Sequence, residues 1–153
     1  MSLTTKNLDD ILWSNEVTNK IFRGTYPSCM FPKSNKPVYA FITNTEDHNK
    51  PGQHWNSWFV RNDTLYFFDS FGREPNHSDF PIYYQTLLKK YRQVQYNKTR
   101  IQAWDAVTCG YFCIHFIYNV LSLGLEIKHF IEGYFKNVYK NDIKVIDFIN
   151  SII

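Results

Sequence analysis

The stretch Thr108–Phe116, which reads TCGYFCIHF, decides the fold of this chain and indicates its chemistry. Apolar residues continue from it at helical spacing, and the opposite side is apolar as well, through Phe112 and Tyr118. A helix that is apolar nearly all round is buried, so we expect a central helix with Cys109 at or near its first turn. Backbone N–H groups and the positive end of the helix dipole favour thiolate over thiol at that position. The sequence therefore predicts that Cys109 is an activated nucleophile.

Three polar residues upstream could serve this thiol. His54 lies in the run GQHW at 52–55, Asp69 lies in YFFDSFG at 66–72, and Gln102 stands seven residues before Cys109. Amide hydrolysis by a thiolate needs a proton donor for the leaving amine, which His54 can supply, while Asp69 can fix the tautomer of its ring. The side-chain amide of Gln102 and the backbone N–H of Cys109 are neutral donors suited to an oxyanion. The four residues thus offer a base, an orienting carboxylate, an oxyanion hole and a nucleophile.

The composition indicates one compact domain. The chain has 153 residues, of which 44% are hydrophobic and 18% aromatic, so it can bury one substantial core. We expect a single domain over residues 1–153, and a monomer. No apolar run approaches the roughly 18 residues of a membrane span, and no charged segment leads into an apolar block at the N-terminus, so we expect neither a span nor a secretory signal. Three cysteines, an odd number, argue for reduced thiols in an intracellular compartment.

Hydrophobic periodicity predicts an α+β domain with a central mixed or antiparallel sheet packed by helices. An opening helix passes through Leu8 and Leu12, with Asn7 or Thr5 as its cap, and the segment 22–27 then breaks the pattern. Strands are expected over 37–43, 55–60, 64–69 and about 94–101, and helices around 80–91, from 109, over 126–134 and over 142–153. The polar interval 44–53 is expected to be a loop. His54 then starts one strand and Asp69 ends the next, so an antiparallel hairpin brings both to the same edge.

These pieces, in this order and spacing, resemble the adenovirus-type cysteine proteases, the adenains, within a larger group that includes the deconjugases of ubiquitin-like proteins. The resemblance covers roughly residues 22–120. It rests on GTY at 24–26, NT at 44–45, the runs around His54 and Asp69, and the step from Gln102 to CGYFC at 109–113. It implies a papain-like α+β fold with a rearranged chain order. It also implies Cys109 as nucleophile, His54 as general base and acid, Asp69 as the carboxylate that orients His54, and Gln102 as part of the oxyanion hole.

The resemblance implies a cysteine endopeptidase that matures viral or virus-like structural precursors, cutting near glycine-containing sites, in the host nucleus or the virion. The chemistry itself requires no cofactor. Adenains of human viruses tether an activating peptide through a cysteine, whereas the matching stretch here, 91–93, reads YRQ. A covalent peptide cofactor is therefore not expected, while a noncovalent peptide or DNA remains open. Adenains often carry Glu where this chain has Asp69, so that position does not separate them from the deconjugases.

Other readings stay open beside this one. The same catalytic residues would serve a deconjugase of ubiquitin-like modifiers, and a catalytically silent binding module could use the same scaffold. Cys109, Cys113 and His115 could be read as zinc ligands, but His115 is expected on a different face from the thiols, and Cys113 is expected in the core. A basic stretch could neutralise the phosphates of DNA or simply be a solvated surface. Its members are Lys89, Lys90, Arg92, Lys98 and Arg100.

Overall fold

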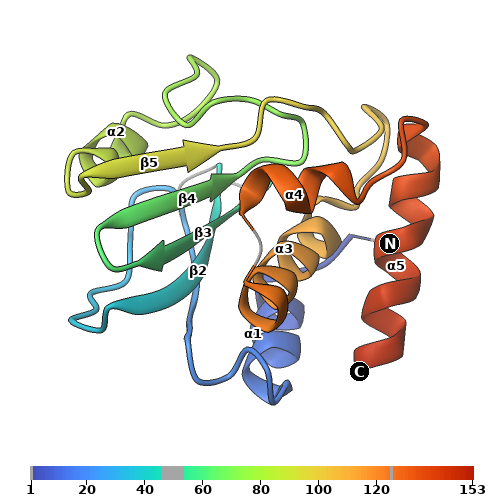
Figure 1. Ribbon diagram of the computed structural model, residues 1–153, viewed down its shortest axis with the longest axis horizontal. Helices are drawn as coiled ribbons and strands as arrows, with labels where there is room; N and C mark the ends of the chain where they lie inside the picture. The colour runs from blue at the N-terminus through green and yellow to red at the C-terminus, as the bar shows by residue number, and fades with distance from the viewer. Residues whose placement is uncertain (1, 46–53, 125) are drawn as a thin grey trace.

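The structure is a computed structural model that describes residues 2–45, 54–124 and 126–153 (Figure 1). Five helices and five strands alternate irregularly along these residues. In chain order they are α1 (Thr5–Ser14), β1 (Phe22–Tyr26), β2 (Val38–Asn44), β3 (Trp55–Arg61), β4 (Thr64–Phe68), α2 (Tyr83–Leu88), β5 (Gln93–Tyr96), α3 (Cys109–Leu123), α4 (Ile127–Glu132) and α5 (Val138–Ile152). The predicted α+β class is thereby confirmed.

The strands form one mixed sheet in the order β1-β2-β3-β4-β5. The central pairs β2/β3 and β3/β4 are antiparallel, while β1 and β5 run parallel to their neighbours at the two edges. Within the hairpin of β3 and β4, Ser57 pairs with Phe68, so the residue just before β3 and the residue just after β4 come to the same edge. The sheet register therefore places His54 beside Asp69, as the sequence predicts.

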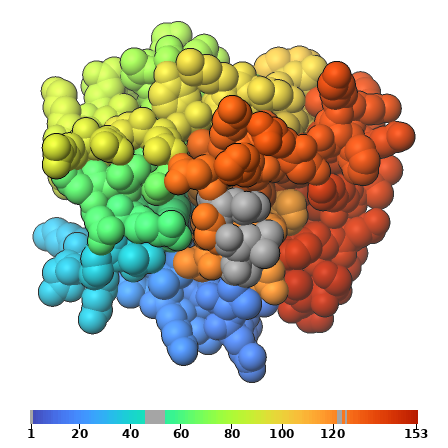
Figure 2. Space-filling model, viewed as in Figure 1, coloured from blue at the N-terminus to red at the C-terminus, as the bar shows by residue number. Residues whose placement is uncertain are grey.

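Both faces of the sheet are covered, because the strand side chains are apolar on each side. On one face, Ile42, Phe59 and Phe68 pack into a core with α1, α3 and α5. On the other face, Phe41, Trp58 and Phe67 pack with Tyr84 of α2. Figure 1 shows α3 lying between the sheet and α5. Figure 2 shows the orange and red surfaces of α4 and α5 side by side on this face of the molecule. The burial of α3 on both sides agrees with its apolar sequence.

The first strand was not predicted, because residues 22–27 lack a strand pattern of their own. Phe22–Tyr26 nevertheless forms β1, parallel to β2, with Phe22 fully buried. The register shifts between Phe22 and Thr25, where Gly24 has a φ of 109°. This backbone conformation favours glycine. Pairing with a distant strand, rather than local propensity, forms this element.

Several predicted boundaries are also wrong. The strand expected over 94–101 ends at Tyr96, because the side chain of Asn97 turns to bond the backbone of Asp69. The helix expected around 80–91 is only α2, although its flanking aromatic residues pack in the same core. The last helix begins at Val138 rather than 142, with Asn137 as its cap. The first helix is capped by Thr4, which shares a capping box with Asn7.

The other closing helix is shorter than expected, since 126–134 was predicted and α4 spans Ile127–Glu132. The expected loop at 44–53 falls largely outside the described residues. Of that interval, Asn44 closes β2 and Thr45 follows it. No helix among the described residues is long and apolar enough to cross a membrane.

Candidate active site

The thiol of Cys109 lies at the N-terminus of α3, facing a cleft. Cys109 is the first residue of the helix and is 8% exposed. The N–H groups of a first helical turn have no partner within the helix, so they are available to an anion. Gly110 lets this end of the helix approach its neighbours, since a Cβ there would lie 3.2 Å from Leu3 and 3.4 Å from Trp55. The helix start predicted at Cys109 is confirmed.

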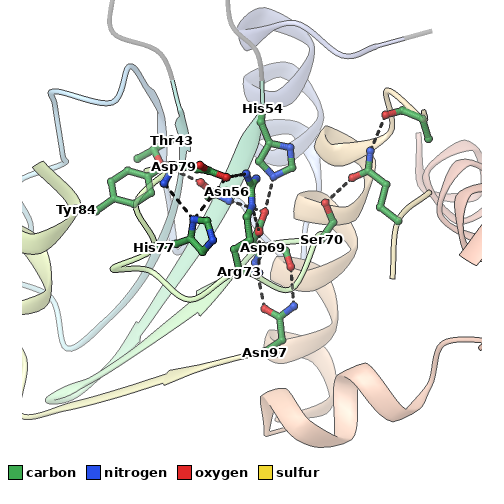
Figure 3. A network of polar contacts seen from close by, with 12 residues as sticks. Thr43, His54, Asn56, Asp69, Ser70, Arg73, His77, Asp79, Tyr84 and Asn97 are labelled. Carbon is green, nitrogen blue, oxygen red and sulfur yellow. Dashed lines mark hydrogen bonds and ion pairs between the residues drawn. The ribbon is translucent and has the colours of Figure 1, made fainter. Parts of the chain in front are cut away.

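His54 and Asp69 meet at the edge of the sheet (Figure 3), and His54 lines the same cleft as Cys109. The Nε2 atom of His54 lies 2.5 Å from Oδ1 of Asp69, and both side chains are buried. With Nε2 engaged by the carboxylate, Nδ1 is the ring nitrogen left for the hydrogen bond between His54 and Cys109. The structure therefore joins the three predicted residues in one chain of polar contacts.

Four donors hold the carboxylate of Asp69. Oδ1 accepts from His54 and, at 3.1 Å, from Nδ2 of Asn56. Oδ2 accepts from the backbone N–H of Arg73 at 3.0 Å and from its Nε at 2.9 Å. Burial alone would raise the pKa of this carboxyl, but His54 and Arg73 outweigh it and lower the pKa. Asp69 is therefore an ionised carboxylate with a fixed orientation.

The same pair determines the charge of His54. Burial disfavours the imidazolium, but the hydrogen bonds to Asp69 and Cys109 favour it and raise the pKa of His54 to about 9. The ring also stacks on Phe71, with centroids 4.8 Å apart and planes at 19°. At neutral pH the ring therefore carries a proton beside the sulfur, which is the arrangement that a thiolate nucleophile needs.

Gln102 is buried at 1% exposure and lines the same cleft. Its Oε1 accepts from the hydroxyl of Ser70 at 2.5 Å, and its Nε2 donates to the carbonyl of Ala106 at 2.8 Å. An amide nitrogen has two N–H groups, so one remains for a ligand. Gly72, at a φ of 75°, brings the turn after Asp69 against the backbone of residues 98–100, where a Cβ would lie 2.7 Å from the Thr99 carbonyl carbon.

The segment between Gln102 and Cys109 has no helix or strand and is held from α5 instead. Asp142 accepts from the hydroxyl of Thr108 at 2.5 Å and from the backbone N–H of Ala103 at 3.3 Å. Its neighbour Asn141 donates to the carbonyl of Ile101 at 3.0 Å. These supports were not predicted from the sequence, and neither were the contacts of Ser70, Asn56 and Arg73. For Asn141 and Asp142, the only signal in the sequence was their polarity near the start of the last predicted helix.

The cleft has a volume of about 730 Å³ and includes Cys109, His54 and Gln102 in its lining. Trp55 forms part of one wall and donates from Nε1 to the Leu3 carbonyl at 3.2 Å. Trp104, 66% exposed, lines the cleft as well. It stacks on the Phe71 ring that covers His54, with centroids 4.8 Å apart. Aromatic side chains thus surround the polar centre.

The alternative zinc site is not assembled. Among residues 2–45, 54–124 and 126–153 no group of three or more His, Cys, Asp or Glu side chains is placed to hold a metal ion. The ring of His115 hydrogen-bonds the hydroxyl of Tyr134 and packs on Phe130. Cys113 is buried in the core, and burial raises the pKa of its thiol. Cys113 is therefore a buried core thiol, one helical turn from Cys109.

The basic stretch divides into two parts. Arg100 turns toward the cleft, where its guanidinium lies 4.6 Å from the Trp104 ring centroid and donates to the carbonyl of Gln102. The other four residues are exposed and flank β5, which is an edge strand. We call these four the basic patch: Lys89, Lys90, Arg92 and Lys98.

Comparison with known proteins agrees with the resemblance. The family model described as adenovirus endoprotease matches residues 20–127. A protein of Acanthamoeba polyphaga mimivirus named "Putative thiol protease R355" is 32% identical over 96 residues, which are 54% of this chain and 30% of that protein.

Two crystal structures of the ASFV pS273R protease, one with selenomethionine, are each 24% identical to this chain. They have TM-scores of 0.45 and 0.44, and the matches cover 72% and 69% of this chain and 43% of each of theirs. The chain spans less than half the length of these relatives.

Proposed function

The chain belongs to the adenovirus endoprotease family, and from this premise and the site geometry we propose that it is a cysteine endopeptidase. One observation carries the proposal. The thiol at the tip of α3, the imidazole of His54 and the carboxylate of Asp69 form a continuous set of contacts, with the free N–H of Gln102 lining the same cleft. This set supplies each group that thiol-dependent amide hydrolysis requires.

The first half of the reaction forms a thioester. The Cys109 thiolate attacks the scissile carbonyl carbon, and the carbonyl π electrons move to the oxygen. Nε2–H of Gln102 and the backbone N–H of Cys109 stabilise that oxyanion, and removal of one such donor costs roughly 10²–10³ in rate. As the C–N bond breaks, His54 Nδ1 gives its proton to the leaving amine. Asp69 steadies the ring throughout, through Nε2.

The second half releases the acid. Neutral His54 takes a proton from water, and the resulting hydroxide attacks the thioester carbon. The C–S bond then breaks as the oxyanion collapses, which returns the thiolate beside a protonated imidazole. The buried Asp69 keeps the same hydrogen bonds through both halves, so the ring does not have to turn between accepting and donating the proton.

The proposed substrates are polypeptides, namely structural precursors of a virus or virus-like element, cut near glycine-containing sites in the host nucleus or the virion. Family membership supports the viral setting, and the aromatic cleft supports the preference for glycine. Between the Trp55 wall and Trp104, a residue without a side chain passes with the least steric conflict. The chemistry itself requires no cofactor, and a noncovalent peptide or DNA is a candidate activator.

The basic patch is the proposed surface for DNA binding. Its four side chains are exposed on either side of the edge strand β5, where they can reach phosphates without disturbing the site. Neutralising four phosphates gives a slope of log affinity against log salt of about −3 to −4. Fluorescence anisotropy of a labelled duplex between low and moderate salt measures that slope. A slope near zero would exclude the basic patch as the binding surface.

The enzymatic proposal is tested by mapping cuts in a denatured peptide library by mass spectrometry under reducing conditions. Wild type should produce internal cuts at glycine-containing sites, and Cys109→Ala should produce none. Cys113→Ser is the matched control, a cysteine change one helical turn away, and should keep most of the activity. Cuts that persist in Cys109→Ala would refute the proposal. If peptides stay intact but folded conjugates of ubiquitin-like proteins are cleaved, the chain is a deconjugase.

A further inference from the structure

Ser70 lies between two residues that serve the imidazole, yet its own contacts go elsewhere. It is 2% exposed, and neither half of the proposed reaction uses its hydroxyl. The hydroxyl donates to Oε1 of Gln102 at 2.5 Å. The Ser70 carbonyl also accepts from the backbone N–H groups of Ile101 at 2.9 Å and Gln102 at 3.2 Å. Ser70 therefore holds both the main chain and the side chain of Gln102.

The direction of a glutamine amide matters in an oxyanion hole. One side of the amide is an acceptor and the other carries two donors, so a rotation by half a turn replaces attraction of the oxyanion by repulsion. The Ser70 hydroxyl donates to the acceptor side, and the Ala106 carbonyl, which can only accept, takes one N–H of the donor side. Both contacts select the same orientation. The second Nε2–H is thereby left for the cleft.

We propose that Ser70 is a positioning residue for the oxyanion hole, fixing the Gln102 amide so that its remaining N–H faces the substrate carbonyl oxygen. This inference rests on the proposed peptidase function. A hydrogen bond to the amide oxygen also polarises the amide and strengthens its N–H as a donor. Because Ser70 follows Asp69 directly, one turn after β4 aligns the base on one side and the oxyanion donor on the other.

The test compares Ser70→Ala with Ser57→Ala, a matched loss of one buried hydroxyl in β3. Ser57 is also fully buried, and among the described residues no hydrogen bond joins its hydroxyl to Gln102. On a cleaved peptide, Ser70→Ala should lower kcat by about tenfold to a hundredfold, less than loss of the donor itself, with KM within about twofold. Alkylation of Cys109 by iodoacetamide, which needs no oxyanion hole, should keep its wild-type rate. Ser57→Ala should keep the wild-type kcat.

A double variant separates positioning from a general effect on the fold. Ser70→Ala should cost little in a Gln102→Ala background, because the group it positions is gone. An equal loss of kcat with and without Gln102 would overturn the inference. So would an unchanged kcat in Ser70→Ala, or a fall in alkylation that matches the fall in kcat, which would place the effect on the thiol.

A spectroscopic readout keeps the inference testable apart from activity. In wild type, the two Nε2 protons of Gln102 should give separate, slowly exchanging NMR signals, since one is bonded to the Ala106 carbonyl. In Ser70→Ala those signals should shift and exchange faster, and in Ser57→Ala they should not. Unchanged signals in Ser70→Ala would contradict the positioning role even if wild type proves inactive on peptides. Inactive wild type with the shifted signals would contradict only the proposed function.

Discussion

The two sides of the cleft are built by different means. His54 and Asp69 flank adjacent antiparallel strands, so the hydrogen-bond register of β3 and β4 places them together. Gln102 and Cys109 are joined by a segment without helix or strand, which is held by side chains from distant parts of the chain. The side with His54 and Asp69, which we call the sheet side, is therefore determined locally by strand pairing. The side with Gln102 and Cys109, which we call the nucleophile side, depends on long-range hydrogen bonds. Remote substitutions should therefore affect the second side more.

Loss of the His54 imidazole, on the sheet side, should have the largest effect on activity. His54→Ala removes both the partner of the thiolate and the proton donor for the leaving amine, so kcat should fall by roughly 10⁴-fold or more. Steady-state cleavage of a fluorogenic peptide measures this. Addition of imidazole to the variant should restore part of the rate. A variant that keeps more than a tenth of the wild-type kcat would remove His54 from the mechanism.

The change of activity with pH should be the second largest effect. His54 must be protonated to serve the leaving amine, so activity should decline as pH rises through about 9, the raised pKa of this group. The free energy of unfolding should depend on the protonation of His54 as well. Because folding raises the pKa above its ordinary value of 6.5, the contribution is complete below about pH 6.5 and is lost as pH approaches about 9.

Urea unfolding of wild type and His54→Gln across this pH range measures that contribution. The difference in unfolding free energy between the two should shrink from pH 6.5 to pH 9. Folding lowers the pKa of Asp69, so its contribution to the free energy of unfolding has the opposite pH dependence and is lost only at acid pH. A stability difference that grows with pH would show that His54 is neutral in the folded protein.

A moderate effect is expected from the distant support of the nucleophile side. Asp142→Ala removes the acceptor for Thr108 and Ala103, so the segment before Cys109 should loosen. We expect kcat to fall about tenfold and the free energy of unfolding by about 1.5–3 kcal/mol, the usual range for hydrogen bonds to a charged group. Asp147→Ala, on the same helix, is the control. Equal activity of the two variants would show that α5 does not hold the site.

The smallest effect should come from Trp104, whose ring is largely exposed. Trp104→Ala should raise KM about threefold to tenfold, because the exposed indole offers binding area, while surface truncation changes stability by less than about 0.5 kcal/mol. Peptide kinetics and thermal unfolding measure the two effects. Unchanged KM would mean that the ring only covers Phe71 and does not touch substrate.

Features that depend on local sequence could be predicted, whereas features that depend on long-range contacts could not. His54 and Asp69 were placed correctly because alternation and a short turn specify a hairpin locally, and Cys109 because a continuous apolar helix begins there. Strand β1 was not predicted, because it forms by pairing with β2 and its own residues show no strand pattern. Ser70 and Asp142 were missed because each reaches a partner more than thirty residues away. Hydrogen bonds across such separations leave no periodic signal.

A mechanism-based label tests whether Cys109 is the thiol that His54 activates. A glycine-containing peptide with a vinyl methyl ester at its C-terminal end accepts a thiolate at the vinyl carbon and forms a stable thioether. Peptide mapping by mass spectrometry should find the label on Cys109 in wild type and almost none in His54→Ala. Label on Cys113 or Cys29, or equal labelling of Cys109 without His54, would contradict the account.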